Sequence, residues 1–287
     1  MSAALEINGL RKAYKGFALK DVSFAVPEGT IMGLVGPNGA GKTTVIKLIL
    51  NLVRREAGTV RVFGLDNLAE EKAAKTRIGF VHETPTLVED IRLADLAAAT
   101  ALFYPKWDHR RLESLMREFE LNPAQKFKTL SHGMKMKFSL VLALAHEADL
   151  LVLDEPTSGL DPVFRRELLE RLSDVIQDGR KSVLFSTHIT SDLERTADYI
   201  TLLLDGAVVL SSTRDEFRDG WAVVKGGREL LDPARRTLFK AVRELTYGVE
   251  ALTSDIPAAR AAFPSAVFDR VSIEDIMIFL NPGAPHV

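Results

Sequence analysis

One nine-residue stretch has the residue types and spacing of a phosphate-binding loop: Gly36, Pro37, Asn38, Gly39, Ala40, Gly41, Lys42, Thr43 and Thr44. The stretch fits the pattern G-x-x-x-x-G-K-[ST], in which glycines let backbone N–H groups curl around phosphate oxygens. It follows an apolar run and opens a run with helical spacing, and the N-terminus of a helix favours anions. We predict that these residues bind a nucleotide, with Lys42 at its β- and γ-phosphates and the Thr43 hydroxyl on Mg²⁺. A glycine-rich turn that contains lysine by chance is the alternative, and the strand–loop–helix context argues against it.

Two acids, Asp154 and Glu155, end the apolar stretch "LLVL" and could act on a bound nucleotide. The carboxyl ends of buried strands are where α/β proteins place their ligands. We predict that Asp154 holds Mg²⁺ through its waters and that Glu155 orients and deprotonates an attacking water. The alternative is that the acids cap the next helix, but Asp161 and Pro162 already serve that helix start.

A single histidine, His188, follows another apolar run in "STHIT". From that place its ring could donate a hydrogen bond to a γ-phosphate, although a lone histidine is more often an ordinary core or surface residue. The other histidines of the sequence form no metal-ligand cluster.

Ser131 and Gly133 lie in "LSHGMKMK", at the start of an apolar helical run. A serine at a helix start usually caps the first turn. A hydroxyl and bare backbone N–H groups at a helix start also make an anion site, and Gly133 would let a phosphate approach closely. Both roles remain open on the residues alone.

The composition narrows the class of protein. The chain has 287 residues, of which 46% are hydrophobic and 26% charged, and its net charge is −2; these are values of an ordinary globular protein. Its arginine pairs are scattered, so we expect no nucleic-acid partner. The absence of cysteine excludes disulfides and thiol catalysis and fits a reducing compartment. We expect no signal peptide and no membrane span, and therefore a cytoplasmic protein that would serve a membrane only through a partner.

Strands alternate with helices along residues 1–215, which predicts an α/β domain with a parallel sheet and right-handed crossovers. Short strand-like runs occupy residues 3–35, and a helix is predicted directly after the phosphate loop. Residues 84–147 have mostly helical spacing and interrupt the alternation, so we predict an inserted helical subdomain there. Residues 216–287 combine strand-like runs with a closing helix and predict a separate small α+β module.

Taken together, these motifs resemble the ATP-binding subunits of ABC transporters over roughly residues 3–215. The phosphate loop is similar to the family's Walker A loop, "LLVLDEP" to its Walker B strand, "SGLD" (Ser158–Asp161) to its D-loop, and "STHIT" to the segment with its switch histidine. The most specific match is "LSHGM", which is similar to the LSGGQ signature. The resemblance implies a P-loop NTPase fold with a RecA-like core, an antiparallel β edge, the helical subdomain and the small C-terminal module.

The resemblance also implies that a second chain completes the nucleotide site. In the family, two ATPase subunits dimerise head to tail, and the signature of one closes on the γ-phosphate bound to the Walker A loop of the other. Ser131 and Gly133 would then bind a nucleotide held by the other subunit of a homodimer or heterodimer, and Asp161 of the D-loop would lie at the nucleotide. Tyr14 stands where the family places an aromatic ring that stacks on adenine.

Two motifs depart from the family pattern. His132 and Met134 replace the first glycine and the glutamine of the signature, a variant similar to that of bacterial multi-subunit exporters. Aligned without gaps, "IGFVHE" matches the family's Q-loop but ends in Glu83 instead of glutamine. The resemblance implies that this residue contacts Mg²⁺ and the attacking water, and a carboxylate keeps the oxygen while losing the amide donor. If the alignment slips by one residue, the corresponding side chain is His82.

We therefore expect an ATPase that uses ATP and Mg²⁺ to drive transport, export rather than import, through separately encoded transmembrane permease subunits on the inner face of the cell membrane. One alternative is a soluble ABC-type ATPase that acts on ribosomes or DNA, but there is one Walker A loop and no sustained heptad run. Another is a regulatory module with poor hydrolysis, against which Asp154, Glu155 and His188 argue. Residues 216–287 would stabilise the dimer or contact the partner, or only decorate the fold.

Overall fold

The computed structural model describes residues 2–177 and 179–281, and the chain divides into two compact units at Ser211/Ser212. The sequence predicts a boundary after Asp215, which falls inside helix α8 (Arg214–Asp219). Helix α8 begins at Arg214 because Thr213 and Glu216 form a capping box, in which each side chain accepts a hydrogen bond from the other residue's N–H.

A six-stranded sheet forms the centre of the first unit, in the order β10-β9-β3-β8-β7-β6. Its strands are β3 (Ile31–Val35), β6 (Ile78–Val81), β7 (Leu150–Leu153), β8 (Ser182–Thr187), β9 (Tyr199–Leu204) and β10 (Ala207–Thr213). Strands β6, β7, β8, β3 and β9 pair in parallel. Every residue of β3, β7 and β8 is buried; β3 and β7 are accordingly apolar throughout, whereas β8 also contains the buried polar residues Ser182, Ser186 and Thr187.

The antiparallel edge is a second sheet of the first unit, in the order β2-β1-β4-β5. Its strands are β1 (Ala3–Tyr14), β2 (Phe17–Pro27), β4 (Ala57–Val62) and β5 (Leu65–Asp66). Helix α1 (Lys42–Ile49) packs into one hydrophobic core with residues of both sheets, among them Leu5, Leu34 and Val152. The helix that follows the phosphate loop is therefore held from both sides.

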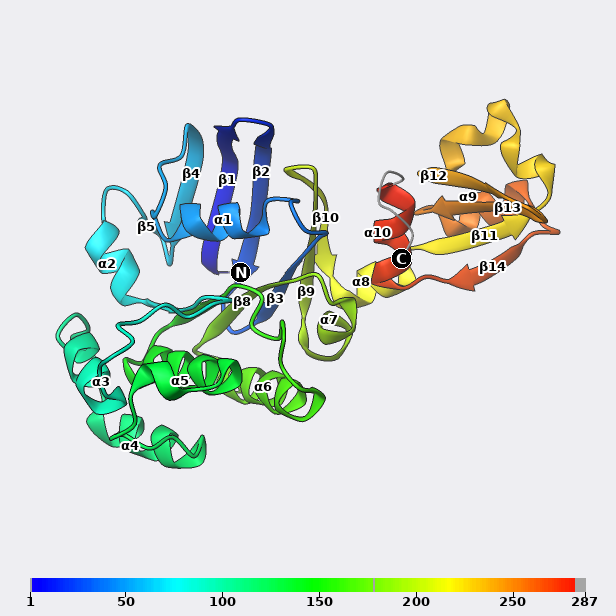
Figure 1. The fold of residues 1–287 in the computed structure, drawn as a ribbon. Coiled ribbons are helices and arrows are strands. Elements are labelled where there is room, and N and C mark those ends of the chain that lie inside the picture. Colours follow the sequence, from blue (N-terminus) through cyan, green and yellow to red (C-terminus); the bar gives the residue numbers. More distant parts are fainter. Residues whose placement is uncertain (1, 178, 282–287) are drawn as a thin grey trace. The chain divides into compact units, whose positions relative to one another are not determined.

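Helices of the inserted segment lie on one side of the first unit, away from the antiparallel sheet (Figure 1). They are α3 (Leu93–Ala101), α4 (His109–Glu118), the short η1 (Phe127–Thr129) and α5 (His132–Ala145). The helical segment predicted from residue 84 begins only at Leu93, since Pro85 disfavours a helical conformation of the residue before it. Helix α5 packs against β6 and so ties the insert to the central sheet.

Three further helices complete the first unit. These are α2 (Glu71–Thr76), α6 (Pro162–Val175) and α7 (Thr190–Thr196). Helices α6 and α7 pack against each other, and α7 also contacts β3. Helices α2 and α7 were not predicted from the sequence, because they have only six and seven residues and therefore show less than two full turns of helical periodicity.

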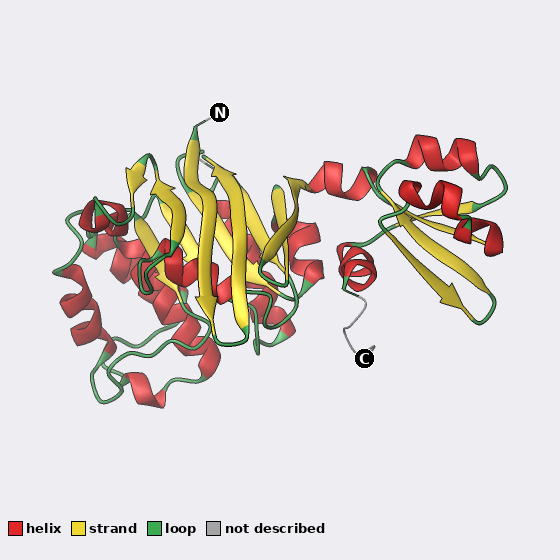
Figure 2. Ribbon diagram, turned by 90° about the horizontal axis from the view of Figure 1, so that it is seen from above, coloured by secondary structure: helices red, strands yellow, loops and turns green. Residues whose placement is uncertain are grey.

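The second unit is a four-stranded antiparallel sheet in the order β12-β13-β11-β14, with helices packed on it (Figure 2). Its elements after α8 are β11 (Ala222–Gly226), η2 (Arg228–Leu231), η3 (Pro233–Leu238), β12 (Ala241–Leu245), β13 (Gly248–Thr253), α9 (Ile256–Ala262), β14 (Val267–Arg270) and α10 (Ile273–Leu280). One of the strand-like runs predicted within residues 216–287 contains the turn of the β12–β13 hairpin, where Leu245 pairs with Gly248. A core of its own, with Phe239 stacked on Phe263, holds the unit together.

Candidate functional site

An open pocket of about 690 Å³ lies over the phosphate loop. Six of its lining residues come from that loop and the start of α1: Asn38, Gly39, Gly41, Lys42, Thr43 and Thr44. The others come from separate parts of the first unit: Gly16, Phe17, Glu83, Glu155, Ser158 and His188. The structure thus brings nine of the residues predicted from the sequence to one pocket.

Backbone geometry explains the glycines of the loop. A Cβ atom at Gly36 would lie 2.2 Å from the carbonyl oxygen of Leu203, and one at Gly41 would lie 2.7 Å from the Phe17 ring. Gly41 also has φ +109°, a conformation that side chains disfavour. The side chain of Ala40, also in the loop, is buried. Because α1 begins at Lys42 without a side-chain cap, the N–H groups of its first turn remain available for an anion such as a phosphate.

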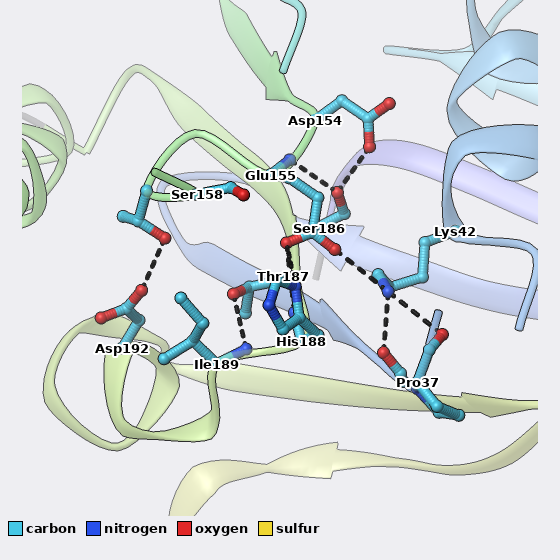
Figure 3. Close-up of polar contacts among 12 residues, drawn as sticks. Pro37, Lys42, Asp154, Glu155, Ser158, Ser186, Thr187, His188, Ile189 and Asp192 are labelled. Carbon is cyan, nitrogen blue, oxygen red and sulfur yellow. Dashed lines mark hydrogen bonds and ion pairs between the residues drawn. The ribbon is translucent and has the colours of Figure 1, made fainter. Parts of the chain in front are cut away.

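Lys42 is held inside the pocket by three oxygens (Figure 3). Its Nζ donates hydrogen bonds to the carbonyls of Gly36 at 2.7 Å and Pro37 at 3.3 Å. It also lies 3.0 Å from Oε1 of Glu155, and both side chains are more than nine-tenths buried. The ammonium group is therefore fixed at the loop, where it can neutralise phosphate charge.

Asp154 and Thr43 present oxygens next to each other, as a Mg²⁺ site requires. The hydroxyl of Thr43 donates to Oδ1 of Asp154 at 3.2 Å, and the buried hydroxyl of Ser186 donates to the same oxygen at 2.7 Å. Mg²⁺ is commonly held by a few protein oxygens together with waters and substrate phosphates. Asp154 is buried behind the pocket instead of lining it, which fits a carboxylate that acts on the metal through water.

Glu155 is positioned by backbone and by histidine. Its N–H donates to the Ser186 hydroxyl at 2.9 Å, so Ser186 joins the two acids. Its φ is +46°, an uncommon conformation for a residue with a side chain. Oε2 of Glu155 accepts hydrogen bonds from the N–H and Nδ1 of His188 at 3.2 and 2.8 Å. With Nδ1 donating to the carboxylate, Nε2 is the ring atom left for the phosphate contact predicted from the sequence, and it donates to a phosphate only when the ring carries protons on both nitrogens.

The position of Glu83 in the pocket bears on the register of the Q-loop. Glu83 lines the pocket, whereas His82 does not. The ring of His82 accepts a hydrogen bond from the N–H of Thr84 at 3.0 Å and packs edge-on against Phe80. The ungapped alignment, which puts Glu83 at the family's glutamine position, therefore agrees with the geometry.

The aromatic ring at the pocket is that of Phe17, a residue that the sequence analysis missed. Tyr14 lies opposite Phe17 across the β1–β2 hairpin, is 45% exposed and does not line the pocket. The stacking role predicted for Tyr14 thus fits Phe17 better. Ser186 was also missed, although its position two residues before His188 in "FSTH" was a usable signal.

The signature residues lie away from the pocket. Ser131 caps α5, where its hydroxyl accepts a hydrogen bond from the N–H of Met134, and both Ser131 and His132 are exposed. A Cβ atom at Gly133 would meet only ordinary contacts, so nothing among residues 2–177 and 179–281 requires glycine there. Asp161 also does not line the pocket; its Oδ1 accepts from the N–H groups of Val163 and Phe164 and caps α6.

Known proteins are similar to this chain in sequence and in fold. The family model described as "ABC transporter" matches residues 19–158. The chain is 32% identical to the ABC transporter ATP-binding protein YtrB of Bacillus subtilis over 77% of this chain and 76% of that protein. It is also 32% identical to Nod factor export ATP-binding protein I of Rhizobium johnstonii, over 71% of this chain and 67% of that protein. A solved ATP-binding subunit of an ABC transporter superposes with a TM-score of 0.70 at 33% identity, covering 75% of this chain and 92% of the other.

The family match, the relatives and the shared fold agree with the pocket chemistry. Each points to a P-loop NTPase that binds and hydrolyses ATP. The chain belongs to the family of ATP-binding subunits of ABC transporters.

Proposed function

We propose that this ATPase works as a head-to-tail dimer with two composite ATP sites and drives export through separately encoded membrane subunits. One observation carries the proposal: the chain holds phosphate and base groups in one pocket, with Asp154 hydrogen-bonded to the pocket residue Thr43, while its signature serine is exposed outside that pocket. A second copy, or a related subunit, supplies the missing signature to the pocket. Dimers of this kind close by symmetry, because each chain gives the same two surfaces.

Mg²⁺ is the second cofactor of the proposal. Thr43 and Asp154 would hold it with Glu83 nearby, and all three offer the oxygen atoms that this ion prefers. When bound, the ion neutralises charge on the β- and γ-phosphates. The sensitivity of ATP turnover to chelators tests this part of the proposal.

Glu155 is the base of the proposed reaction, and two neighbouring side chains hold its carboxylate. Oε1 contacts Lys42 and Oε2 contacts His188, so both carboxylate oxygens are engaged. When Lys42 turns toward phosphate oxygens, Oε1 becomes free to accept a proton from water. His188 keeps the carboxylate oriented through Nδ1 while its Nε2 faces the substrate.

A surface for the membrane subunit lies between α2 and the end of α3. This groove, of about 720 Å³, is lined by Leu68, Phe103 and Tyr104 together with the polar face of α2. Phe103 is 73% exposed, and exposed large apolar side chains that gather in one place mark interaction sites.

No helix within residues 2–177 and 179–281 is long and apolar enough to cross a bilayer. We therefore assign the membrane passage to permease subunits and place this chain peripherally at the cytoplasmic face.

Export as the direction rests on two similarities. The signature variant is similar to that of bacterial exporters, and one relative carries a name that states Nod factor export. The transported compound would be selected by the membrane subunits.

The proposed transport function is tested by co-expressing this chain with a multi-span membrane protein encoded by a neighbouring gene. We expect the two to co-purify and the membrane protein to raise the ATPase rate. Phe103→Asp should abolish co-purification while basal ATPase activity persists. Val209→Asp, a change at a 44% exposed apolar residue of β10 outside this groove, serves as the matched control. Stimulation by ribosomes or DNA instead of the membrane protein would favour the soluble alternative.

A further inference from the structure

His132 links the signature segment to the ATP pocket of its own chain. It is the first residue of α5, at the position where related signatures have glycine. Its Nε2 lies 3.3 Å from the carbonyl oxygen of Ser158. Its ring also lies beside Gly159, 3.8 Å from where a Cβ atom of that residue would stand. Because Ser158 lines the pocket, one imidazole spans the signature and the pocket.

The hydrogen bond has a defined direction. A carbonyl oxygen only accepts, so Nε2 of His132 donates. One neutral tautomer and the imidazolium ion both carry a proton on Nε2. Glycine at this position would have no group that reaches Ser158.

The loop that receives this bond leads directly to the base. The N–H of Ser158 donates to the carbonyl of Glu155 at 3.1 Å. The neighbouring Thr157 is anchored by a 2.7 Å hydrogen bond to Asp192, which Arg165 in turn holds at 2.8 Å. His132 thus adds a contact from the signature side to a loop that is otherwise anchored on α7.

We propose that His132 is a positioning residue that fixes Ser158 and so couples the state of the signature to the ATP site of the same chain. The inference rests on the proposed composite sites. In the family arrangement, the signature serves the nucleotide of the partner. Through His132 it also acts on the nucleotide of its own chain, so closure at one site is transmitted to the other.

Substitution separates the hydrogen bond from the bulk of the ring. His132→Phe keeps a ring but removes the donor, whereas the amide nitrogen of His132→Gln can occupy the place of Nε2. We expect His132→Phe to lower kcat about fivefold, the effect of one lost hydrogen bond, with KM unchanged. His132→Gln should restore the rate to within about twofold by retaining the donor. His109, the exposed first residue of α4, offers the matched control, and His109→Phe should leave the rate unchanged.

Mixed dimers locate the effect. In a dimer that contains one Lys42→Ala chain, only the pocket of the other chain binds ATP. The inference predicts that His132→Phe slows hydrolysis when it is on the chain that owns the working pocket. Slowing only when His132→Phe is on the Lys42→Ala chain would mean that His132 acts on the partner's nucleotide, and this would overturn the inference.

Two controls separate this inference from the proposed function. If the wild-type chain hydrolyses ATP and Glu155→Gln forms an ATP-dependent dimer, the composite sites stand, and an unchanged kcat in His132→Phe refutes the inference alone. If neither holds, the proposed function fails before His132 is tested. A loss of rate in both His132→Phe and His132→Gln would also refute the inference, since the donor is then not what matters.

Discussion

The ATP pocket and the signature segment both place hydroxyl and backbone N–H groups at the start of a helix, yet the surroundings of the two regions differ. In the pocket, Lys42 and Glu155 are paired with each other, and their side chains are 6% and 8% exposed. At the signature, Ser131 is exposed and its hydroxyl caps the helix on which it sits. The first region is a preorganised site within one chain. The second presents donors at the surface, as half of a site does.

The two regions also differ in the contacts that a bound nucleotide must replace. Breaking a buried ion pair by removing one partner is costly, because the remaining charge stays buried. Nucleotide binding therefore has to replace the contact of Lys42 with Glu155 by contacts to phosphate. Binding at the signature replaces only a cap and surface water. Changes in the pocket should thus affect ATP binding or hydrolysis according to the group removed, and changes at the signature should affect hydrolysis alone.

The largest effect is expected for Glu155→Gln, which removes the base but keeps the shape. We predict a fall in kcat of about a thousandfold, since a positioned base contributes about 10² to 10⁴ to a rate. ATP should still bind, and the protein should elute as an ATP-dependent dimer in size-exclusion chromatography. Normal turnover by this variant would show that Glu155 is not the base.

Lys42→Ala should weaken ATP binding, whereas loss of another lysine of α1 should not. Loss of the ammonium group removes its contacts to phosphate, and we expect ATP affinity to fall about a hundredfold. Lys47, exposed in the same helix, gives the control, and Lys47→Ala should bind ATP as the wild type does. Equilibrium titration with a fluorescent ATP analogue measures both. Wild-type affinity in Lys42→Ala would contradict the assignment of the loop.

His146 is buried directly after the last residue of α5, at the end opposite to the signature. The pH dependence of the free energy of unfolding tests its contribution to stability. It is 2% exposed and stacks on Tyr104 at 3.8 Å, and burial lowers its pKa from 6.5 to about 4. The unfolded chain binds this proton first as the pH falls, so acid destabilises the folded state between these values. Between about pH 7.5 and about pH 5 the wild type should lose about 2 kcal/mol more stability than His146→Phe. Urea unfolding at both pH values measures this, and equal losses would contradict the prediction.

Glu83 should give the smallest effect on the isolated chain. It lines the pocket, but Lys42, Thr43 and the loop already hold the phosphates. We expect Glu83→Gln to keep substantial ATPase activity and Glu83→Ala to bind ATP nearly normally. Glu83→Ala should lose most of the stimulation by the membrane subunit, about fivefold or more if one metal or water contact is lost. The rates are measured with and without that subunit across a Mg²⁺ titration. Full stimulation in Glu83→Ala, with loss in His82→Ala, would assign the role to His82.

Local patterns predicted much of the fold. The buried strands β3 and β7 are apolar runs, β8 has an apolar centre, and the phosphate loop is recognised from its residue spacing alone. The short helices α2 and α7 lack that periodicity, and their position depends on packing against the sheets. The turn between β12 and β13 was hidden within one strand-like run, because Tyr247 at its tip suggests a strand although it is fully exposed.

The site was predictable by residue type but not by pairing. Lys42, Asp154, Glu155 and His188 follow from motif spacing. Their contacts do not, because the Lys42–Glu155 pair and the Ser186 bridge join segments that only the parallel sheet brings together. Tyr14 and Phe17 are paired directly across the β1–β2 hairpin, but only Phe17 lines the pocket, and motif spacing does not distinguish these two rings.

Mixing two inactive variants tests the central claim most directly. Ser131→Arg should bind ATP as a monomer but not hydrolyse it, and Lys42→Ala should offer a sound signature without binding ATP. A mixed dimer of the two contains one intact composite site, so random mixing should restore about one quarter of the wild-type rate if the sites act independently. Each variant alone should remain inactive at the same total concentration. A mixture that stays inactive although the mixed dimer forms, or a Ser131→Arg monomer that cannot bind ATP, would contradict the account.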